Sequence, residues 1–186
     1  MPGKRMGINL ACLSAVVVLC VPGAFAQSMC AGMSGGMSGK SMASVADKKF
    51  VKDAMEGDMA EIQLGQLALQ KASSEDVKQF AQKIIDDHTK LDEQVKPIAM
   101  QVGVTAPTQV SAKDRALMTK LQALSGSAFD KAYVTAIVAD HAMDDKKFKA
   151  EETGGKDPKV KDAATQAEPV IAQHLQMAKD LKKKMG

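Results

Sequence analysis

Apolar residues recur at alternating intervals of three and four along most of this chain. The stripe within residues 74–102 consists of Val77, Ala81, Ile84, Leu91, Val95 and Ile98. This spacing places the stripe on one face of a helix. The same pattern predicts helices over residues 47–71, 128–152 and 158–184, and a shorter helix over residues 113–124. The expected fold is all-α, an antiparallel four-helix bundle with a short extra helix between its second and third long helices.

The residues at the ends of these segments are typical helix signals. Three Ser/Asp pairs have the spacing of a capping box: Ser73 with Asp76, Ser111 with Asp114, and Ser127 with Asp130. Gly103 is expected to end the second long helix, and Asp157 followed by Pro158 to begin the last one.

Four polar side chains interrupt the apolar stripes. They are Glu61, His88, His141 and His174, one near the middle of each long helix. Because the midpoints of neighbouring helices in an antiparallel bundle lie at similar heights, we expect these groups to meet in the core. Three aspartates, Asp58, Asp87 and Asp140, lie close enough in sequence to hold these groups in place by hydrogen bonds, and Asp87 and Asp140 could also serve as alternate ligands. Gly57 and Gly65 flank Glu61 by one turn and leave room for either a ligand or a close helix crossing.

Imidazole and carboxylate side chains together suit a divalent transition metal: Zn, Fe, Mn, Ni or Cu. A di-iron site is not expected, since Ile85, Val138 and Ile171 stand where a Glu-x-x-His motif needs glutamate. The alternative is a structural polar layer, with Glu61 paired to one histidine and the others bonded to Asp140, Asp87 or Tyr133. Such a layer would set the register of the helices and bind nothing.

The N-terminus resembles a secretory signal peptide over residues 1–26. Lys4 and Arg5 precede an apolar run over residues 8–21, and Ala24-Phe25-Ala26 provides a cleavage site after Ala26. The run is too short to span a bilayer comfortably. The residues before Cys30 do not form a lipoprotein motif, so the expected location is periplasmic or secreted, without a lipid anchor.

Residues 27–45 are rich in Gly, Ser and Met and predict a flexible segment before a bundle domain over residues 46–186. Met29, Met33, Met37 and Cys30 are soft ligands that could hold Cu(I), but the composition favours a linker in which these residues are incidental. Cys30 would be the single cysteine after cleavage, which excludes an intramolecular disulfide.

Composition and charge exclude several functions. Lys4 and Arg5 belong to the leader, so the remaining basic residues almost balance the 22 acidic ones, and they are interspersed with them. This balance argues against a nucleic-acid partner. No nucleophile motif and no phosphate-binding glycine loop is present, which disfavours an enzyme. A homo-oligomer or a cell-envelope protein partner stays open.

Several short segments together resemble a known family. They are Phe50, Gly57–Glu61, Leu64-Gly65, Lys71–Ser74, Val77–Ala81, Asp86–His88, Leu124–Asp130 with Tyr133, Asp140-His141, Gly155–Pro158 and His174-Leu175. The chain from Asp47 to Met185 is similar to ferritin-like secreted bacterial proteins of unknown function, often labelled "putative membrane" or "predicted outer membrane" proteins. The resemblance implies a ferritin-like bundle in the cell envelope and supplies no activity. Two functions remain open: metal binding for storage, buffering or stress protection, and a non-catalytic envelope stress or interaction protein.

Overall fold

The computed structural model describes residues 42–186, which form five α-helices and no strands. They are α1 (Val45–Lys71), α2 (Glu75–Val102), α3 (Ala112–Gln122), α4 (Gly126–Gly154) and α5 (Pro158–Lys184). The all-α class and the short extra helix are therefore confirmed. Among these residues, no helix combines the length and apolarity needed to cross a membrane. The predicted signal peptide, its cleavage site after Ala26, and Cys30 with its neighbouring methionines lie outside the described residues.

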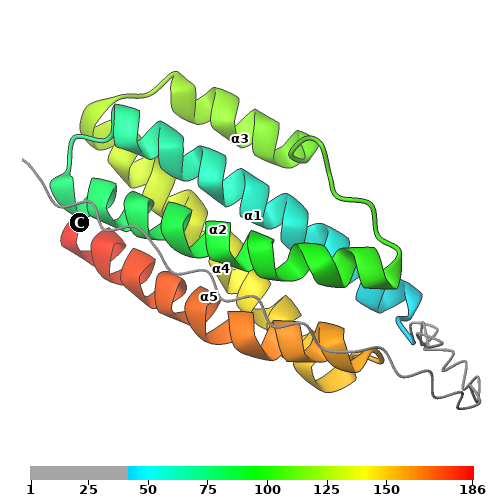
Figure 1. The fold of residues 1–186 in the computed structure, drawn as a ribbon. Coiled ribbons are helices and arrows are strands. Elements are labelled where there is room, and N and C mark those ends of the chain that lie inside the picture. The colour runs from blue at the N-terminus through cyan, green and yellow to red at the C-terminus, as the bar shows by residue number, and fades with distance from the viewer. Residues whose placement is uncertain (1–41) are drawn as a thin grey trace, which may run out of the picture. The chain divides into compact units, whose positions relative to one another are not determined.

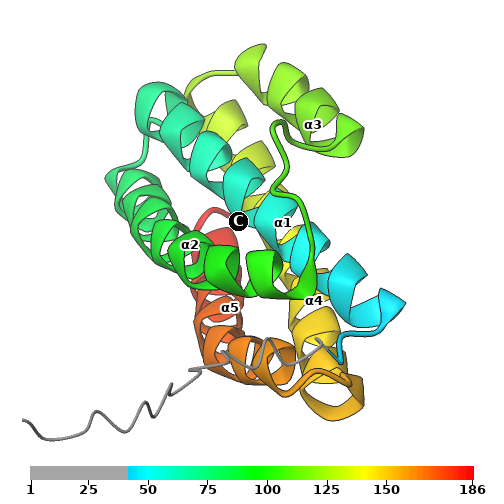
Figure 2. The ribbon, with the colours of Figure 1, turned by 45° about the vertical axis from the view of Figure 1, so that its right-hand side comes forward.

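The four long helices pack in two pairs (Figure 1). α1 lies along α2, and α4 lies along α5, while α2 also contacts α5 and α1 contacts α4. The short helix α3 lies at the edge of this assembly against α1 and α4 (Figure 2). Each long helix thus presents one face to an interior shared by all four.

Local sequence signals set most helix ends as expected. The Ser111 side chain accepts a hydrogen bond from the Asp114 backbone N–H at the start of α3, and Asp157 caps α5 just before Pro158. Gly103 ends α2 with φ 73°, a left-handed conformation that suits glycine. These three predictions are confirmed.

The capping boxes expected at Ser73–Asp76 and Ser127–Asp130 are wrong. α2 begins after Ser74 and α4 after Ser125, and neither serine caps its helix through its side chain. Asp130 instead accepts hydrogen bonds from the backbone N–H groups of Ser73 and Ser74 and from the Ser73 hydroxyl. A tertiary contact between α4 and the α1–α2 turn outcompetes the local cap because one carboxylate there satisfies three donors.

A capping box at the start of α1 also connects α1 to the turn between α4 and α5. Ser44 accepts from the Asp47 backbone N–H, and Asp47 accepts in return from the Ser44 backbone N–H. The same Asp47 carboxylate accepts from the backbone N–H groups of Lys156 and Asp157 in the α4–α5 turn. α1 therefore begins at Val45, slightly earlier than the apolar stripe predicts.

The predicted stripes form most of the core. The largest apolar cluster is built by the two helix pairs together, around Phe80, Ile84, Phe129, Tyr133 and Ile137. On α1, Leu64 is buried in this core, whereas Leu69 is 36% exposed.

The two glycines beside Glu61 have different roles. A Cβ on Gly65 would lie 2.7 Å from Ile85 Cγ1 and 3.1 Å from the Ala81 carbonyl oxygen, so Gly65 permits the close approach of α1 and α2. A Cβ on Gly57 would meet nothing within 4 Å. The close crossing expected for this pair occurs at Gly65 alone, and Gly57 faces open space.

Candidate metal centre

Three histidines from three helices meet in the interior. His88 comes from α2, His141 from α4 and His174 from α5, and each is at most 3% exposed. Their ring centroids are 5.4–5.6 Å apart. Each histidine offers a ring nitrogen that lies within 4.8 Å of those of the other two. We call these three residues the histidine triad.

Two aspartates hold members of the triad by one ring nitrogen each. Asp58 of α1 lies 2.8 Å from His88 Nδ1, and Asp87 of α2 lies 3.0 Å from His174 Nε2. Asp87 thus supports a histidine of α5 and not its chain neighbour His88. A carboxylate accepting one imidazole N–H leaves the lone pair on the other nitrogen and fixes the ring orientation.

Glu61 completes the layer from α1. Its Oε1 lies 3.6 Å from His141 Nδ1, which is an ion-pair distance but too long for a good hydrogen bond. Glu61 is 2% exposed. The structure thus brings all four residues of the expected cluster into one region of the interior.

Many polar atoms of this layer have no hydrogen-bond partner among the described residues. They are both carboxylate oxygens of Glu61, Nε2 of His88, Nδ1 of His174, the hydroxyl of Tyr133 and, apart from a contact with the backbone of Ile137, the ring nitrogens of His141. A buried polar group without a partner costs about 1–3 kcal/mol. A structural polar layer would pair these groups with one another, and this one pairs only Asp58 with His88 and Asp87 with His174.

Burial keeps most of the layer uncharged. Burial, and then the charges of Asp140 and Asp144, raise the pKa of Glu61 well above its usual value. Burial, and then the neighbouring imidazoles, hold the pKa of His141 well below its usual value. Burial likewise lowers the pKa of His174 to about 4, although its hydrogen bond with Asp87 opposes the shift. Imidazoles kept neutral at pH 7 retain the lone pairs that metal ligands need.

The two supporting aspartates differ in their surroundings. Burial raises the pKa of Asp58, and the hydrogen bond and charge of His88 oppose it. Burial would also raise the pKa of Asp87, but its bonds to Lys83, His174 and Lys90 lower it to about 2. Asp87 is therefore ionised at neutral pH and accepts the Nε2–H of His174, which leaves Nδ1 as the unprotonated nitrogen.

Asp140 lies apart from this network. Its carboxylate pairs with Lys113 of α3 at 2.7 Å. Although it follows the apolar stripe of α4 in sequence, its partner is a lysine at the surface and no bond to an imidazole is seen. Asp58 is the better-placed carboxylate, and its position one turn before Glu61 is the sequence signal for it.

A pocket of about 420 Å³ reaches the triad at His88. We call it the acidic pocket because five carboxylates line it: Asp47, Asp53, Asp58, Asp144 and Glu151. Gly57 also lines it, as do Phe50 and Phe148, whose rings meet edge to face at 4.9 Å. Periodicity alone could not reveal this pocket, since its lining comes from four different helices.

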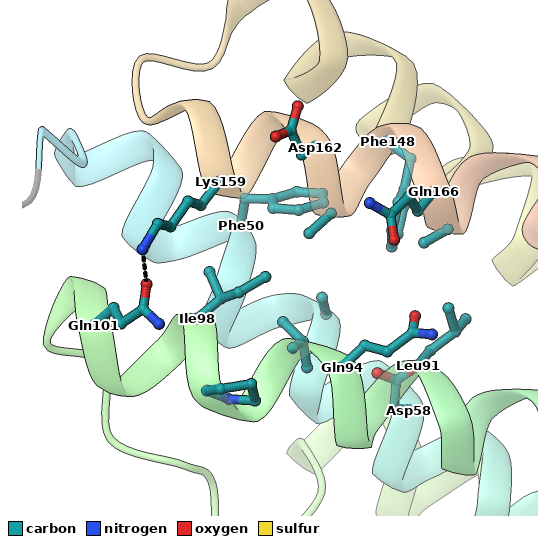
Figure 3. Close-up of a pocket in the computed structure, with 15 residues that line it drawn as sticks. Phe50, Asp58, Leu91, Gln94, Ile98, Gln101, Phe148, Lys159, Asp162 and Gln166 are labelled. Carbon is teal, nitrogen blue, oxygen red and sulfur yellow. Dashed lines mark hydrogen bonds between the residues drawn. The ribbon is translucent and has the colours of Figure 1, made fainter.

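A second pocket of about 400 Å³ shares Phe50 and Phe148 with the acidic pocket (Figure 3). We call it the apolar pocket, since Leu91, Val95, Ile98, Ala163 and Ala167 contribute to its lining. Its rim carries Gln94, Gln101 and Gln166, with Lys159 bonded to Gln101 across the opening. Asp58 lines both pockets, whereas His88 lines the acidic pocket alone.

The fold and the site together define a class of protein: an all-helical chain with a histidine triad buried in its interior. The chain belongs to the family described as Domain of unknown function (DUF4142), which matches residues 32–181. Membership of a helical family without an established activity is thereby confirmed. The ferritin-like and secreted character of that family stays a prediction for this chain.

Solved structures of two other proteins share the fold. One is the crystal structure of a DUF305 fragment from Deinococcus radiodurans, with a TM-score of 0.67, 12% identity, and coverage of 76% of this chain and 98% of that chain. The other is CopM in the Cu(II)-bound form, with a TM-score of 0.64, 16% identity, and coverage of 75% and 97%. A search of curated proteins finds no match. Identities this low show a common fold alone.

Proposed function

We propose that this protein binds one transition-metal ion through His88, His141 and His174, with Glu61 as a fourth ligand. Asp58 and Asp87 orient two of the imidazoles through their outer nitrogens. Storage, buffering or detoxification of a metal in the cell envelope is the role that such a site would serve. We also propose that α1, α2, α4 and α5 form the antiparallel ferritin-like arrangement that places one ligand on each helix.

One observation carries this proposal: the buried imidazoles lie together with ring nitrogens that have no partner among the described residues. A cation would pair these nitrogens, and Glu61 adds a carboxylate beside them, with its Oε1 3.6 Å from His141 Nδ1. First-row metals hold nitrogen ligands at about 2.1 Å, so two ligand nitrogens lie at most about 4.2 Å apart. One ring nitrogen of each histidine lies within 4.8 Å of those of the other two, so binding of a single ion by all three requires these nitrogens to move closer together.

Copper(II) is the first metal to test. A histidine-rich site binds copper more tightly than other divalent first-row ions, following the general order of their complexes. The structural neighbour CopM is described in a Cu(II)-bound form, which supports this choice without assigning its ligands to this chain. Zn, Ni, Fe and Mn are the remaining candidates.

The test is metal loading of the purified protein without a His-tag. We expect about one equivalent of Cu(II) to remain after desalting, and the unfolding free energy to rise by about 2.7 kcal/mol at a free metal concentration of 100 Kd. The electron paramagnetic resonance spectrum of bound Cu(II) should show coupling to imidazole nitrogen. This coupling distinguishes binding at the triad from binding at Cys30 and the nearby methionines. His141→Ala should abolish the effect, and Cys30→Ser should preserve it.

The competing function is an envelope stress or interaction protein in which the histidines only shape the core. The Asp58–His88 and Asp87–His174 hydrogen bonds favour it, because they already satisfy part of the layer. It predicts less than about 0.1 equivalent of any transition metal after loading, and no metal-dependent stabilisation. That result would refute the metal proposal.

A further inference from the structure

We propose that metal ions reach the histidine triad through the acidic pocket, past Gly57, and that the carboxylates lining this pocket speed their arrival. This inference rests on the proposed function and concerns the route and rate of loading. It assigns to Gly57, Asp53 and Asp144 a role that binding affinity alone would not reveal.

The first argument is the position of His88. Its side chain is 3% exposed, yet it contributes to the lining of the acidic pocket. Its Nε2 has no partner among the described residues, while its Nδ1 is bonded to Asp58. His88 is thus the member of the triad that an ion arriving in this pocket meets first.

The second argument is the space beside Gly57. This glycine lines the acidic pocket, and a Cβ built on it would meet nothing within 4 Å. Gly57 has a helical backbone, which any residue can adopt, so backbone conformation does not require glycine here. The missing side chain leaves the passage open one residue before Asp58.

The third argument is charge. Asp53 and Asp144 pair with Lys49 and Lys147, the two lysines of the pocket. Asp47, whose pKa is lowered to about 2, and Glu151, whose pKa of about 7 leaves it partly ionised at neutral pH, give the lining an excess of negative charge. Charges of one sign lining a cleft raise the local concentration of oppositely charged ions and their association rate. The apolar pocket offers only Asp58 and Asp162 against Lys159, and no histidine lines it.

The test is stopped-flow mixing of the metal-free protein with Cu(II), followed by absorbance of the bound ion. Gly57→Leu fills the passage, and we expect it to slow association about tenfold while the equilibrium affinity changes less than about twofold. Two matched controls separate the route from the substitution. Gly57→Ala changes the backbone propensity without filling the pocket, and Ala163→Leu fills the apolar pocket alone. Both should load at nearly the rate of the unmodified protein.

Each outcome is decisive. Equal rates for Gly57→Leu and the unmodified protein would overturn the route, as would slow loading of Ala163→Leu with unaffected Gly57→Leu. A protein that binds no Cu(II), Zn(II) or Ni(II) refutes the proposed function itself, which is a different result from a change in rate.

The charge argument has its own measurement. Asp53→Asn removes one lining carboxylate without touching Asp58 or the triad. We expect a two- to threefold slower association at low ionic strength, and a smaller difference at about 0.5 M salt, where the Debye length is only a few ångströms. A slowing that does not depend on salt would contradict electrostatic attraction as its cause.

Discussion

Two buried carboxylates of this protein have opposite surroundings. Asp130 is 3% exposed and accepts three hydrogen bonds from the turn between α1 and α2. Glu61 is 2% exposed, and neither of its oxygens has a hydrogen-bond partner among the described residues. A carboxylate that serves the fold is fully paired, whereas one that serves a ligand keeps its oxygens available. Burial alone therefore does not mark a candidate site, and the missing partners of Glu61 are what support its place in the proposed metal site.

The largest effect on stability is expected from removing the fully paired carboxylate, Asp130. Asp130→Ala removes three hydrogen bonds to a charged acceptor and should lower the unfolding free energy by about 3 kcal/mol. Urea unfolding of the metal-free protein measures this change. The Cu(II) affinity of the folded fraction should stay within about twofold, because Asp130 bonds to Ser73 and Ser74 and not to the triad. A large loss of affinity would show that the turn and the triad are coupled.

The second prediction concerns the aspartate that orients His88. Asp58→Asn keeps the size of the side chain and removes the charge that holds Nδ1–H, so Cu(II) affinity should fall about 10- to 100-fold. Competition with a chelator of known affinity measures it. Asp87→Asn should act in the same direction through His174. Unchanged affinity in both variants would mean that the two hydrogen bonds are structural only.

These predictions depend on contacts that the sequence revealed unevenly. Helical periodicity located His88, His141 and His174 on inward faces because a 3.6-residue repeat fixes which face each residue occupies. It could not pair residues between helices, because axial rotation and relative height are set by packing. For that reason the sequence could not show that Asp87, the chain neighbour of His88, bonds to His174, or that Asp140, the chain neighbour of His141, bonds to Lys113. The serine caps at Ser73 and Ser127 failed for a similar reason, since tertiary contacts of Asp130 replaced a local motif.

The third prediction concerns Glu61, the carboxyl group without hydrogen-bond partners. Glu61→Met replaces an unpartnered carboxyl by an apolar side chain of similar length, so the metal-free protein should become about 1–2 kcal/mol more stable. The gain in stability on adding Cu(II) should shrink at the same time. Glu61→Gln is the control, since its amide stays polar and should stabilise the metal-free protein less. Destabilisation by Glu61→Met in the absence of metal would show that Glu61 is a structural residue.

The fourth prediction concerns Asp47 and Glu151, a carboxyl pair whose degree of hydrogen bonding lies between that of Asp130 and that of Glu61. Burial, and then the hydrogen bond and charge of Asp47, raise the pKa of Glu151 to about 7. Burial acts on Asp47 too, but backbone donors at Lys156 and Ser44 and the side chain of Glu151 lower its pKa to about 2. The stabilisation from protonated Glu151 is present below pH 4.5 and is lost as the pH rises towards 7.

We expect this loss to be about 1 kcal/mol, less than the full linkage value, because water near the pair screens it. Urea unfolding at pH 4.5 and pH 7.5 measures it, and Glu151→Gln should flatten the difference, since its amide donates to Asp47 at both values. Asp47 contributes in the opposite direction, with stability that falls as the pH drops from 3.8 towards 2. If Glu151→Gln kept the pH dependence of the unmodified protein, a group other than Glu151 would be responsible for the change in stability.

The smallest effects on stability and Cu(II) affinity are expected at the surface, for Asp140. Asp140 pairs with Lys113, whose side chain is 64% exposed, so Asp140→Asn should change the unfolding free energy by less than about 0.5 kcal/mol. Cu(II) affinity should change less than about twofold, because the carboxylate bonds to a solvated lysine and not to His141. Chelator competition, run beside Asp58→Asn, separates the two aspartates directly. An equal loss of affinity in both variants would make long-range charge, and not hydrogen bonding to the imidazoles, the way in which carboxylates support this site.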